Sequence, residues 1–272
     1  MHLIYIIKYI FYSKLLHILK NFLFVKKFFY KSFSVNMIDD YVSKLKKNGY
    51  VIINNFLNKE NCKLIIKEIN NFYDKYPNKV WEDKIKSEYR IHGAEKVSIN
   101  IKNFFINPLL NMVGTVCFNG KLSNLMTMAN RIVSAANNLG SGGGWHKDDV
   151  EFQYKAILYL IDVNDNNGPF QLIKHSNKFK FIIKDCLKYK MKINETRLSE
   201  KKINEIISME PERLKTITGS AGTLILVDTS LIHRGRPLVS GLRYALTNYY
   251  YPSYKLKSMQ NHFLPKVEEI YY

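Results

Sequence analysis

The sequence predicts an α+β domain that is mostly β, in which helices near its N-terminal end brace a β-barrel. Apolar residues recur at helical spacing over 38–45 and 64–72, which predicts two amphipathic helices. Residues 152–163 alternate between a more polar face and an apolar face, as expected for a half-buried strand. Residues 223–227 are nearly all apolar, as expected for a strand that is buried almost throughout. With 272 residues, of which 46% are hydrophobic, the chain can bury one large core, and one barrel domain of this size is common.

Residues 1–36 differ from the rest in composition, because six lysines and no acidic residue stand among many apolar side chains. A lysine about every six residues argues against a membrane span, which needs about 18 uninterrupted apolar residues. The lysines also scatter around a helical wheel instead of sharing one face, which argues against a helix that lies in the membrane interface. A secretory signal is not indicated, because no small-residue cleavage site is present. Three interpretations of residues 1–36 remain. They form a disordered extension, they are a tether that associates weakly with a membrane surface, or translation begins at Met37. The expected domain is therefore 37–272.

The N-terminal part of this domain is predicted to form a helix, a strand and a second helix. The first helix ends in a basic turn before Gly49, a suitable C-cap, and residues 50–53 form a short strand. Asn58 is a good N-cap for the second helix. An apolar stretch predicts a buried helix that starts near Pro108 and ends at Phe118, and residues 122–136 lead into the barrel.

In the strand at 152–163, the face with Tyr154, Ala156 and Leu158 is the apolar one and should pack against the outer helices. The other face, expected in the barrel interior, carries Gln153, Lys155, Ile157 and Tyr159. For Lys155, pairing across strands at the surface is favoured over a functional role.

Residues 177–218 form a long insertion rich in Lys and Glu, in which Ser199 could cap a helix over residues 200–207. We expect the insertion near the mouth of the barrel, where it would carry substrate specificity. The last long strand is predicted over residues 244–251.

The pattern Trp145-His146-Lys147-Asp148 carries the chemistry, because residues two apart on a strand leave the same face and can converge on one ion. His146 and Asp148 would need a second imidazole, and His233 follows the buried strand that ends at Asp228. Two histidines and one carboxylate form a facial triad that leaves three positions on Fe(II) open. The glycines at 140 and 142–144 mark a loop or a close backbone approach.

The order of motifs resembles the phytanoyl-CoA dioxygenase family of Fe(II)/2-oxoglutarate oxygenases. The resemblance runs from residue 37 to residue 255 and is carried by His146-x-Asp148, the Asn-Gly-Pro turn at 167–169, His233-x-Gly235 and Gly241-x-Arg243. One departure is His175-Ser-Asn, which stands where Gly-Ser-His is usual.

The resemblance implies a double-stranded β-helix, the jelly-roll or cupin-like barrel. It also implies Fe(II), 2-oxoglutarate as co-substrate and O2, with hydroxylation of a small organic substrate and release of succinate and CO2. Arg243 would hold the distal carboxylate of 2-oxoglutarate, because a guanidinium matches a carboxylate bidentately. Arg236 is the competing choice, and Gln153 and Arg131 are further candidates for contact with 2-oxoglutarate. For Arg131 a surface ion pair is the alternative.

Related activities are less well supported. Halogenases of this kind lack the carboxylate that Asp148 supplies. A nucleic-acid demethylase of this kind would carry the motif Arg-x-Asn-x-Thr-x-Arg. Here Arg243 is followed by Thr247, but Tyr249 stands where the second Arg would be. A non-catalytic barrel that binds a metal or another ligand is the remaining alternative.

The net charge of +18 would attract anions. However, Lys, Asn, Ile and Tyr are abundant together, which indicates a general bias in composition. We therefore favour solvated basic faces without a specific nucleic-acid partner. The three cysteines, Cys62, Cys117 and Cys186, lie far apart and indicate neither a disulfide framework nor a zinc knuckle. This usage favours a reducing compartment, and we expect a cytoplasmic location. The sequence does not indicate an oligomeric state.

Overall fold

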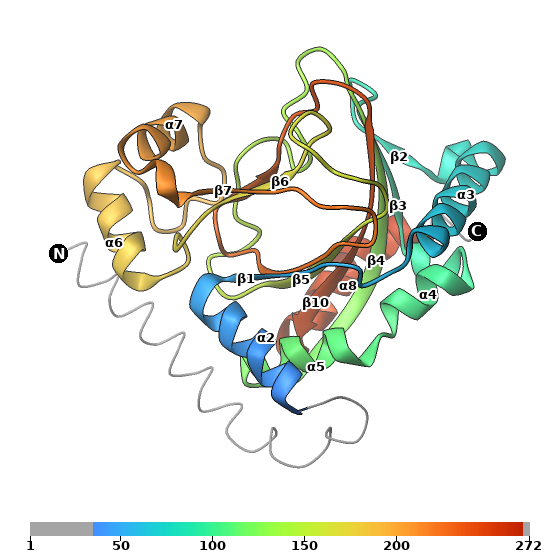
Figure 1. Cartoon of the computed structure of the whole chain (residues 1–272), viewed down its shortest axis with the longest axis horizontal. Coiled ribbons are helices and arrows are strands. Elements are labelled where there is room, and N and C mark those ends of the chain that lie inside the picture. Colours follow the sequence, from blue (N-terminus) through green and yellow to red (C-terminus); the bar gives the residue numbers. More distant parts are fainter. Residues whose placement is uncertain (1–34, 269–272) are drawn as a thin grey trace.

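The computed structural model of the chain describes residues 35–268 (Figure 1). The interpretations of residues 1–36 concern a segment that lies outside the described residues, apart from its last two, which begin the first described helix. Within residues 35–268, no helix combines the length and the apolar character needed to cross a bilayer.

Two antiparallel sheets form the β part of the described chain. The larger has seven strands in the order β1-β8-β5-β10-β4-β3-β2, and the smaller has three in the order β7-β6-β9. Their strands are β1 Tyr50–Ile53, β2 Trp81–Glu82, β3 Glu88–His92, β4 Leu122–Val133, β5 Tyr154–Tyr159, β6 Phe170–Ile173, β7 Leu214–Ile217, β8 Leu224–Asp228, β9 His233–Gly235 and β10 Leu242–Pro252. The predicted mostly β, α+β fold of the double-stranded β-helix type is confirmed.

Helices surround these sheets, and Figure 1 shows most of them on the outer side of the larger sheet. The α-helices are α2 Val35–Asn48, α3 Lys59–Lys75, α4 Ile99–Phe105, α5 Pro108–Phe118, α6 Phe179–Lys188, α7 Glu200–Met209 and α8 Ser253–Glu268. Short 3-10 turns cover Pro77–Lys79, Ala94–Lys96 and Pro211–Arg213.

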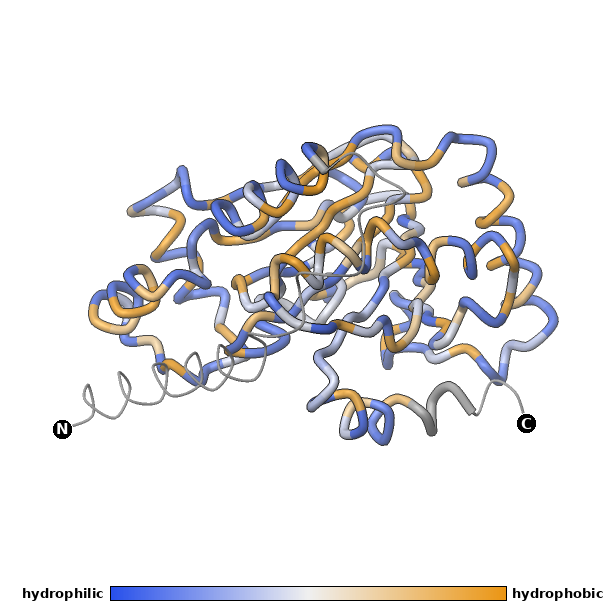
Figure 2. The backbone as a smooth tube through the Cα atoms, turned by 90° about the horizontal axis from the view of Figure 1, so that it is seen from below, coloured by the Kyte–Doolittle hydropathy of each residue, from blue (hydrophilic) through white to orange (hydrophobic). Residues whose placement is uncertain are grey.

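The outer face of the larger sheet packs against α2, α3, α4 and α5. Ala156 and Leu158 of β5 belong to the same buried cluster as Ile65 and Ile69 of α3, so the predicted outer face of this strand is confirmed. Gly114 of α5 lies so close to the Tyr154 ring that a Cβ would meet it at 2.5 Å, which lets helix and sheet approach closely. In Figure 2 the hydrophobic segments accordingly gather in the middle of the molecule.

A second cluster fills the space between the sheets. Ile157 of β5 and Ile225 of β8 meet Phe170 and Leu172 of β6 there. Burying each such side chain contributes about 1.5–3 kcal/mol, so this core holds the two sheets face to face. The cavity described below opens beside it.

The insertion folds as α6 and α7 against β7 and has its own core, in which Ile203 and Ile206 of α7 pack with Trp145. Ser199 caps α7 by accepting a hydrogen bond from the backbone of Lys202, as predicted. Asn58 caps α3 in the same way, and Gly49 ends α2 at a φ of +82°. Helices α4, α6 and α8 and the short strands β2, β3, β7 and β9 had not been predicted.

A candidate metal centre in the barrel

His146, Asp148 and His233 converge in the structure, and one ligand atom from each lies within 4.8 Å of the other two. Nε2 of His146 is 3.8 Å from Asp148 Oδ1, and Nε2 of His233 is 3.6 Å from Asp148 Oδ2. The expected regular strand through His146 is wrong, because His146 makes only isolated bridges, one to Arg197 and one to His233. Two backbone hydrogen bonds in the bridge to His233, 2.9 and 2.8 Å long, hold the two histidines side by side.

Backbone carbonyls fix the orientation of both imidazoles. Nδ1 of His146 lies 2.9 Å from the carbonyl oxygen of Gly144, and Nδ1 of His233 lies 2.8 Å from that of Leu231. A proton on Nδ1 satisfies each carbonyl and leaves the lone pair on Nε2, the atom that faces Asp148. The three side chains therefore present two nitrogen atoms and one carboxylate to a common point.

The chain before each histidine explains its position. Gly142 passes so close to the His146 ring that a Cβ would lie 2.2 Å from it, and its φ is +89°, which confirms the predicted close backbone approach. Before His233, the carboxylate of Asp228 accepts hydrogen bonds from the backbone and the hydroxyl of Ser230. This turn ends β8 and carries the chain across to β9 in the smaller sheet.

The ionisation of the three groups suits a divalent cation. Burial lowers the pKa of the His146 imidazole, although Asp148 acts in the opposite direction, and burial together with the neighbouring His146 lowers the pKa of His233 to about 3. Burial raises the pKa of the Asp148 carboxyl, but Lys155 and the two imidazoles outweigh it, so the net shift is downward. Near neutral pH the site offers two neutral nitrogen donors and an ionised carboxylate, which is the form that metals bind.

Lys155 lies inside the barrel, so the prediction that favoured a surface pairing for it is wrong. Its ammonium is 2.7 Å from Asp148 Oδ2, and the side chain is only 9% exposed. The ammonium also lies 4.2 Å from the centre of the Tyr249 ring. The interior face predicted for Lys155 and Tyr159 is confirmed, since both line the cavity.

Arg243 also lies in the barrel, where it is buried and lines the same cavity. Its Nη1 donates to the carbonyl of Gly168, whereas its Nε is buried without a hydrogen-bond partner. Gly235 leaves room for the guanidinium, because a Cβ there would be 3.0 Å from Nη2. The glycine in His233-x-Gly235 thus has a steric reason.

Two other residues that were predicted to contact 2-oxoglutarate, Gln153 and Arg131, are not part of the cavity wall. The Gln153 amide donates to the carbonyl of Tyr250 at 2.7 Å, because β5 begins only at Tyr154 and strand alternation does not extend to Gln153. The Arg131 guanidinium faces the helices and stacks on Tyr73 and Tyr89 at 4.9 and 4.6 Å. Its alternative, a surface ion pair, is not what the structure shows either.

Arg236, the competing choice for the co-substrate, and His175, from the segment that departs from the family pattern, also lie away from the triad. Arg236 pairs with Asp165 at 3.6 Å, and its side chain is 38% exposed. The His175 ring stacks on Phe181, with 5.0 Å between the ring centres. Neither residue lines the cavity.

The triad opens onto a cavity of about 320 Å³ between the two sheets. Its wall includes Lys155, Ile157 and Tyr159 of β5 and Arg243 with Thr247 of β10. The insertion contributes Thr196 and Arg197, and Arg197 donates to the carbonyl of Gly142. The insertion therefore lies beside the site, as predicted.

Comparison with known proteins settles the family. A family model for phytanoyl-CoA dioxygenase (PhyH) matches residues 45–243, which include the triad and Arg243. The chain belongs to the phytanoyl-CoA dioxygenase family. No curated protein matches the sequence.

Solved structures related to this phytanoyl-CoA dioxygenase family member share its fold at low sequence identity. SnoN, the non-heme alpha ketoglutarate dependent epimerase from nogalamycin biosynthesis, aligns with a TM-score of 0.58 and 12% identity over 81% of this chain and 85% of that chain. HygX from Streptomyces hygroscopicus with nickel and 2-oxoglutarate bound aligns with a TM-score of 0.57 and 13% identity, over 79% and 87% of the two chains. The carbocyclase SnoK from nogalamycin biosynthesis gives 0.56 and 13%, over 80% and 84%.

Several residues of the cavity were missed from the sequence. Arg90, Met128, Asn130 and Tyr249 line it from β3, β4 and β10. For Tyr249, the alternation that places Arg243 in the barrel leads to the same face six residues later. Arg90 had no such signal, because the residues around β2 and β3 show no clear periodicity.

Proposed function

We propose that this chain is an Fe(II)- and 2-oxoglutarate-dependent oxygenase that hydroxylates a small organic substrate, with release of succinate and CO2. The observation that supports it best is the convergence of His146, Asp148 and His233 beside a buried guanidinium. Family membership supports the same reaction type. HygX, whose structures contain iron in one case and nickel with 2-oxoglutarate in another, shares the fold.

The donor set fits Fe(II). Nε2 of each histidine carries the free lone pair, and the carboxylate of Asp148 completes a three-residue facial set. Bound iron would supply the activation of oxygen, while the protein supplies position and shields the site from water. Asp148 occupies the position that a halide would need, which supports hydroxylation over halogenation.

Arg243 fits the distal carboxylate of 2-oxoglutarate. Its Nε has no protein partner in a buried position, and an unpaired buried donor of this kind costs free energy until a ligand accepts from it. The Tyr159 hydroxyl beside it is held by the backbone of Phe170 at 2.8 Å and Ile217 at 3.0 Å. This part of the wall is therefore rigid, and a carboxylate can approach the guanidinium without rearrangement.

The test is succinate formation by the purified chain with Fe(II), ascorbate, O2 and 2-oxoglutarate. We expect slow succinate release without substrate, and its loss in Asp148→Ala. Asp149→Ala is the matched control, because Asp149 is the adjacent carboxylate and pairs with Lys255 at 2.6 Å instead. Binding of metal and 2-oxoglutarate without succinate, even with cell extract as a source of substrate, would favour the non-catalytic barrel.

The kind of product separates hydroxylation from the reactions named for the structural relatives. SnoN is described as an epimerase and SnoK as a carbocyclase. A hydroxylated product has gained one oxygen atom, a cyclised product has lost two hydrogen atoms, and an epimer has the same mass. Comparison of metabolites from wild-type cells and a His146→Ala strain by liquid chromatography with mass spectrometry would distinguish the three outcomes, because an epimer differs in retention time at equal mass.

A further inference from the structure

A row of side chains crosses the inner face of the larger sheet, away from Arg243. The strand registers pair Ala245 with both Tyr159 and Asn130, Asn130 with Arg90, and Arg90 with Trp81. Residues opposite one another in neighbouring strands point to the same face. The row therefore leads from the cavity floor across β10, β4 and β3 to the edge strand β2, and Arg90 lies about 10 Å, two strand spacings, from Ala245.

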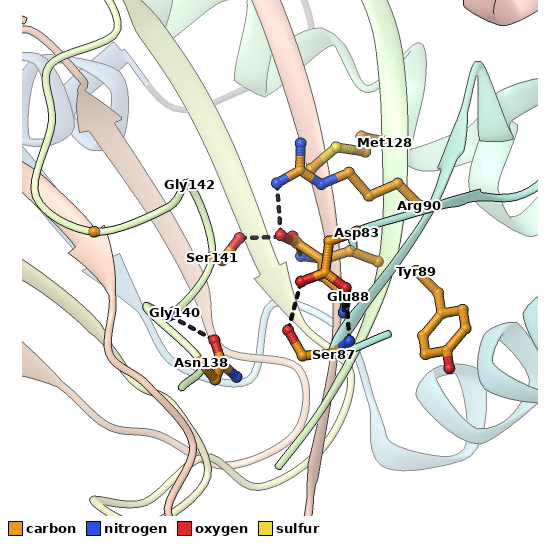
Figure 3. A network of polar contacts seen from close by, with 12 residues as sticks. Asp83, Ser87, Glu88, Tyr89, Arg90, Met128, Asn138, Gly140, Ser141 and Gly142 are labelled. Atoms are coloured by element: carbon orange, nitrogen blue, oxygen red, sulfur yellow. Dashed lines mark hydrogen bonds and ion pairs between the residues drawn. The ribbon is translucent and has the colours of Figure 1, made fainter. Parts of the chain in front are cut away.

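Arg90 is held in one orientation by two neighbours. Its Nη2 donates to Glu88 Oε2 at 2.6 Å, and Ser141 Oγ donates to Glu88 Oε1 at 2.8 Å. Figure 3 shows the Glu88 carboxylate between Ser141 and Arg90. The Trp81 ring lies 4.6 Å from the guanidinium carbon, so the guanidinium is fixed before any ligand arrives.

Polar atoms in this part of the wall lack protein partners. Arg90 Nε and Asn130 Oδ1 are both buried without a hydrogen bond. Among the described residues, Nη2 is the one nitrogen of the Arg90 guanidinium that has a hydrogen-bond acceptor. An arginine that pairs with a carboxylate frequently donates from two nitrogen atoms at once. The remaining donors are available to a ligand in the cavity that Arg90 lines.

The charge of the wall favours an anion. The basic residues that line the cavity within the described part of the chain are Arg90, Lys147, Lys155, Arg197 and Arg243, whereas its acidic lining is Asp148. Lys155 pairs with Asp148 and Arg90 with Glu88, whereas no ion pair with a carboxylate is found for Arg243, Arg197 or Lys147 among the described residues. A cavity with this excess of positive charge concentrates anions, and one 2-oxoglutarate would place a single distal carboxylate on one of these arginines.

We propose that Arg90 binds an anionic group of the substrate, a carboxylate or a phosphate, and thereby determines specificity. This inference rests on the proposed function and identifies the class of its substrate. The distal carboxylate of 2-oxoglutarate occupies Arg243 on β10, and the substrate lies over Ala245 and Asn130 with its anionic group at Arg90. Trp81, which is 41% exposed, borders the substrate beyond the guanidinium.

The experiment is a fluorescence titration of the full chain loaded with Ni(II) and saturating 2-oxoglutarate, in which no turnover occurs. The probes are phenyl phosphate, phenylacetate and the uncharged phenylacetamide. The chain has two tryptophans, and Trp81 contacts Arg90, so Trp81→Phe tests whether the signal reports this site. We expect one or both acids to bind and the amide to bind at least about tenfold more weakly, since a charge-assisted hydrogen bond contributes that much or more.

Arg90→Gln should weaken binding of the preferred acid at least about tenfold, while the affinity for 2-oxoglutarate changes less than about twofold. Because this change leaves Glu88 buried without its partner, Glu88→Gln/Arg90→Gln is measured alongside it and should lose the acid in the same way. Arg236→Gln is the matched control, because Arg236 is outside the cavity wall and partly exposed. A stronger response to phenyl phosphate than to phenylacetate identifies a phosphate-bearing substrate, and the reverse identifies a carboxylate.

Three results would overturn the assignment. The acids could bind equally well to the double variant, the amide could bind as tightly as the acids, or 2-oxoglutarate could compete with the acids, which would place Arg90 in the co-substrate site. Failure of the proposed function gives a different result, because succinate formation would then be absent, whatever the response of Arg90 to the acids.

Discussion

The ammonium of Lys155 lies at hydrogen-bonding distance from one oxygen of Asp148, beside the face of Tyr249. A carboxylate that ligates a metal through one oxygen is commonly hydrogen-bonded through the other, and such partners orient the ligand. Lys155 acts on Asp148 in this way, and its charge opposes the effect of burial by lowering the pKa of the carboxyl. A lysine in the interior is thus explained by the candidate metal ligand that it orients.

Lys155→Met should therefore weaken the binding of Ni(II) or Mn(II) roughly 10- to 100-fold, the usual effect of removing a residue that supports a metal ligand. Calorimetric titration of the metal-free protein measures it. Lys255→Met is the matched control, since Lys255 pairs with the adjacent Asp149 at the same kind of distance, and it should leave metal affinity unchanged. Tighter binding in Lys155→Met would mean that the lysine competes with the metal instead of supporting its ligand.

At the scale of elements, a buried ion pair joins helix α6 of the insertion to the residue that precedes β7. Arg213, just before β7, donates to both carboxylate oxygens of Asp185 in α6, at 2.7 and 2.8 Å. Both side chains are almost fully buried, at 2% and 3% exposure. Because the insertion also supplies Thr196 and Arg197 to the cavity wall, this pair connects the stability of the insertion to the shape of the site.

Removing Asp185 leaves the buried Arg213 with only the longer contact to Glu210, at 3.8 Å, so Asp185→Ala should lower the free energy of unfolding by about 3–5 kcal/mol, measured by urea denaturation. Asp40→Ala is the comparison, because the Lys44–Asp40 pair has a similar distance, 2.6 Å, but is about half exposed and should cost less than about 1 kcal/mol. Asp185→Leu/Arg213→Met, which removes both charges, should recover much of the loss. Equal effects of Asp185→Ala and Asp40→Ala would contradict the argument.

Elements with local signals could be predicted from the sequence, and elements defined by distant pairing could not. Asn58 and Ser199 cap their helices through their own side chains, and β5 has one face against helices and one against the cavity, so its alternation is visible. Strand β4 is buried on both faces along much of its length, so nothing local showed that Arg131 points to the helices. Arg90 lies on a short strand defined by its pairing with β4, which no nearby residue specifies.

At the scale of the whole molecule, the candidate metal centre joins parts of the chain that otherwise meet only through the core. His233 belongs to β9 in the smaller sheet, His146 and Asp148 lie in the loop before β5, and Lys155 extends from the larger sheet to Asp148. The triad is distributed over segments that must come together on folding, and a metal ion that binds all three ligands binds only the folded state. Metal binding is therefore linked to the stability of the entire barrel.

A metal present at 100 times its Kd should stabilise the protein by about 2.7 kcal/mol, which corresponds to a rise in Tm of roughly 5–10 °C for a domain of this size. Thermal unfolding with Ni(II), compared with EDTA, measures the shift, and excess EDTA should reverse it. Asp148→Ala should abolish the shift because one of three ligands is lost, whereas Arg243→Gln, which leaves the triad intact, should retain it. If Asp148→Ala showed the full shift, the metal would be binding elsewhere, for example to the acidic and histidine side chains of the surface, and the assignment of the triad as the metal centre would be wrong.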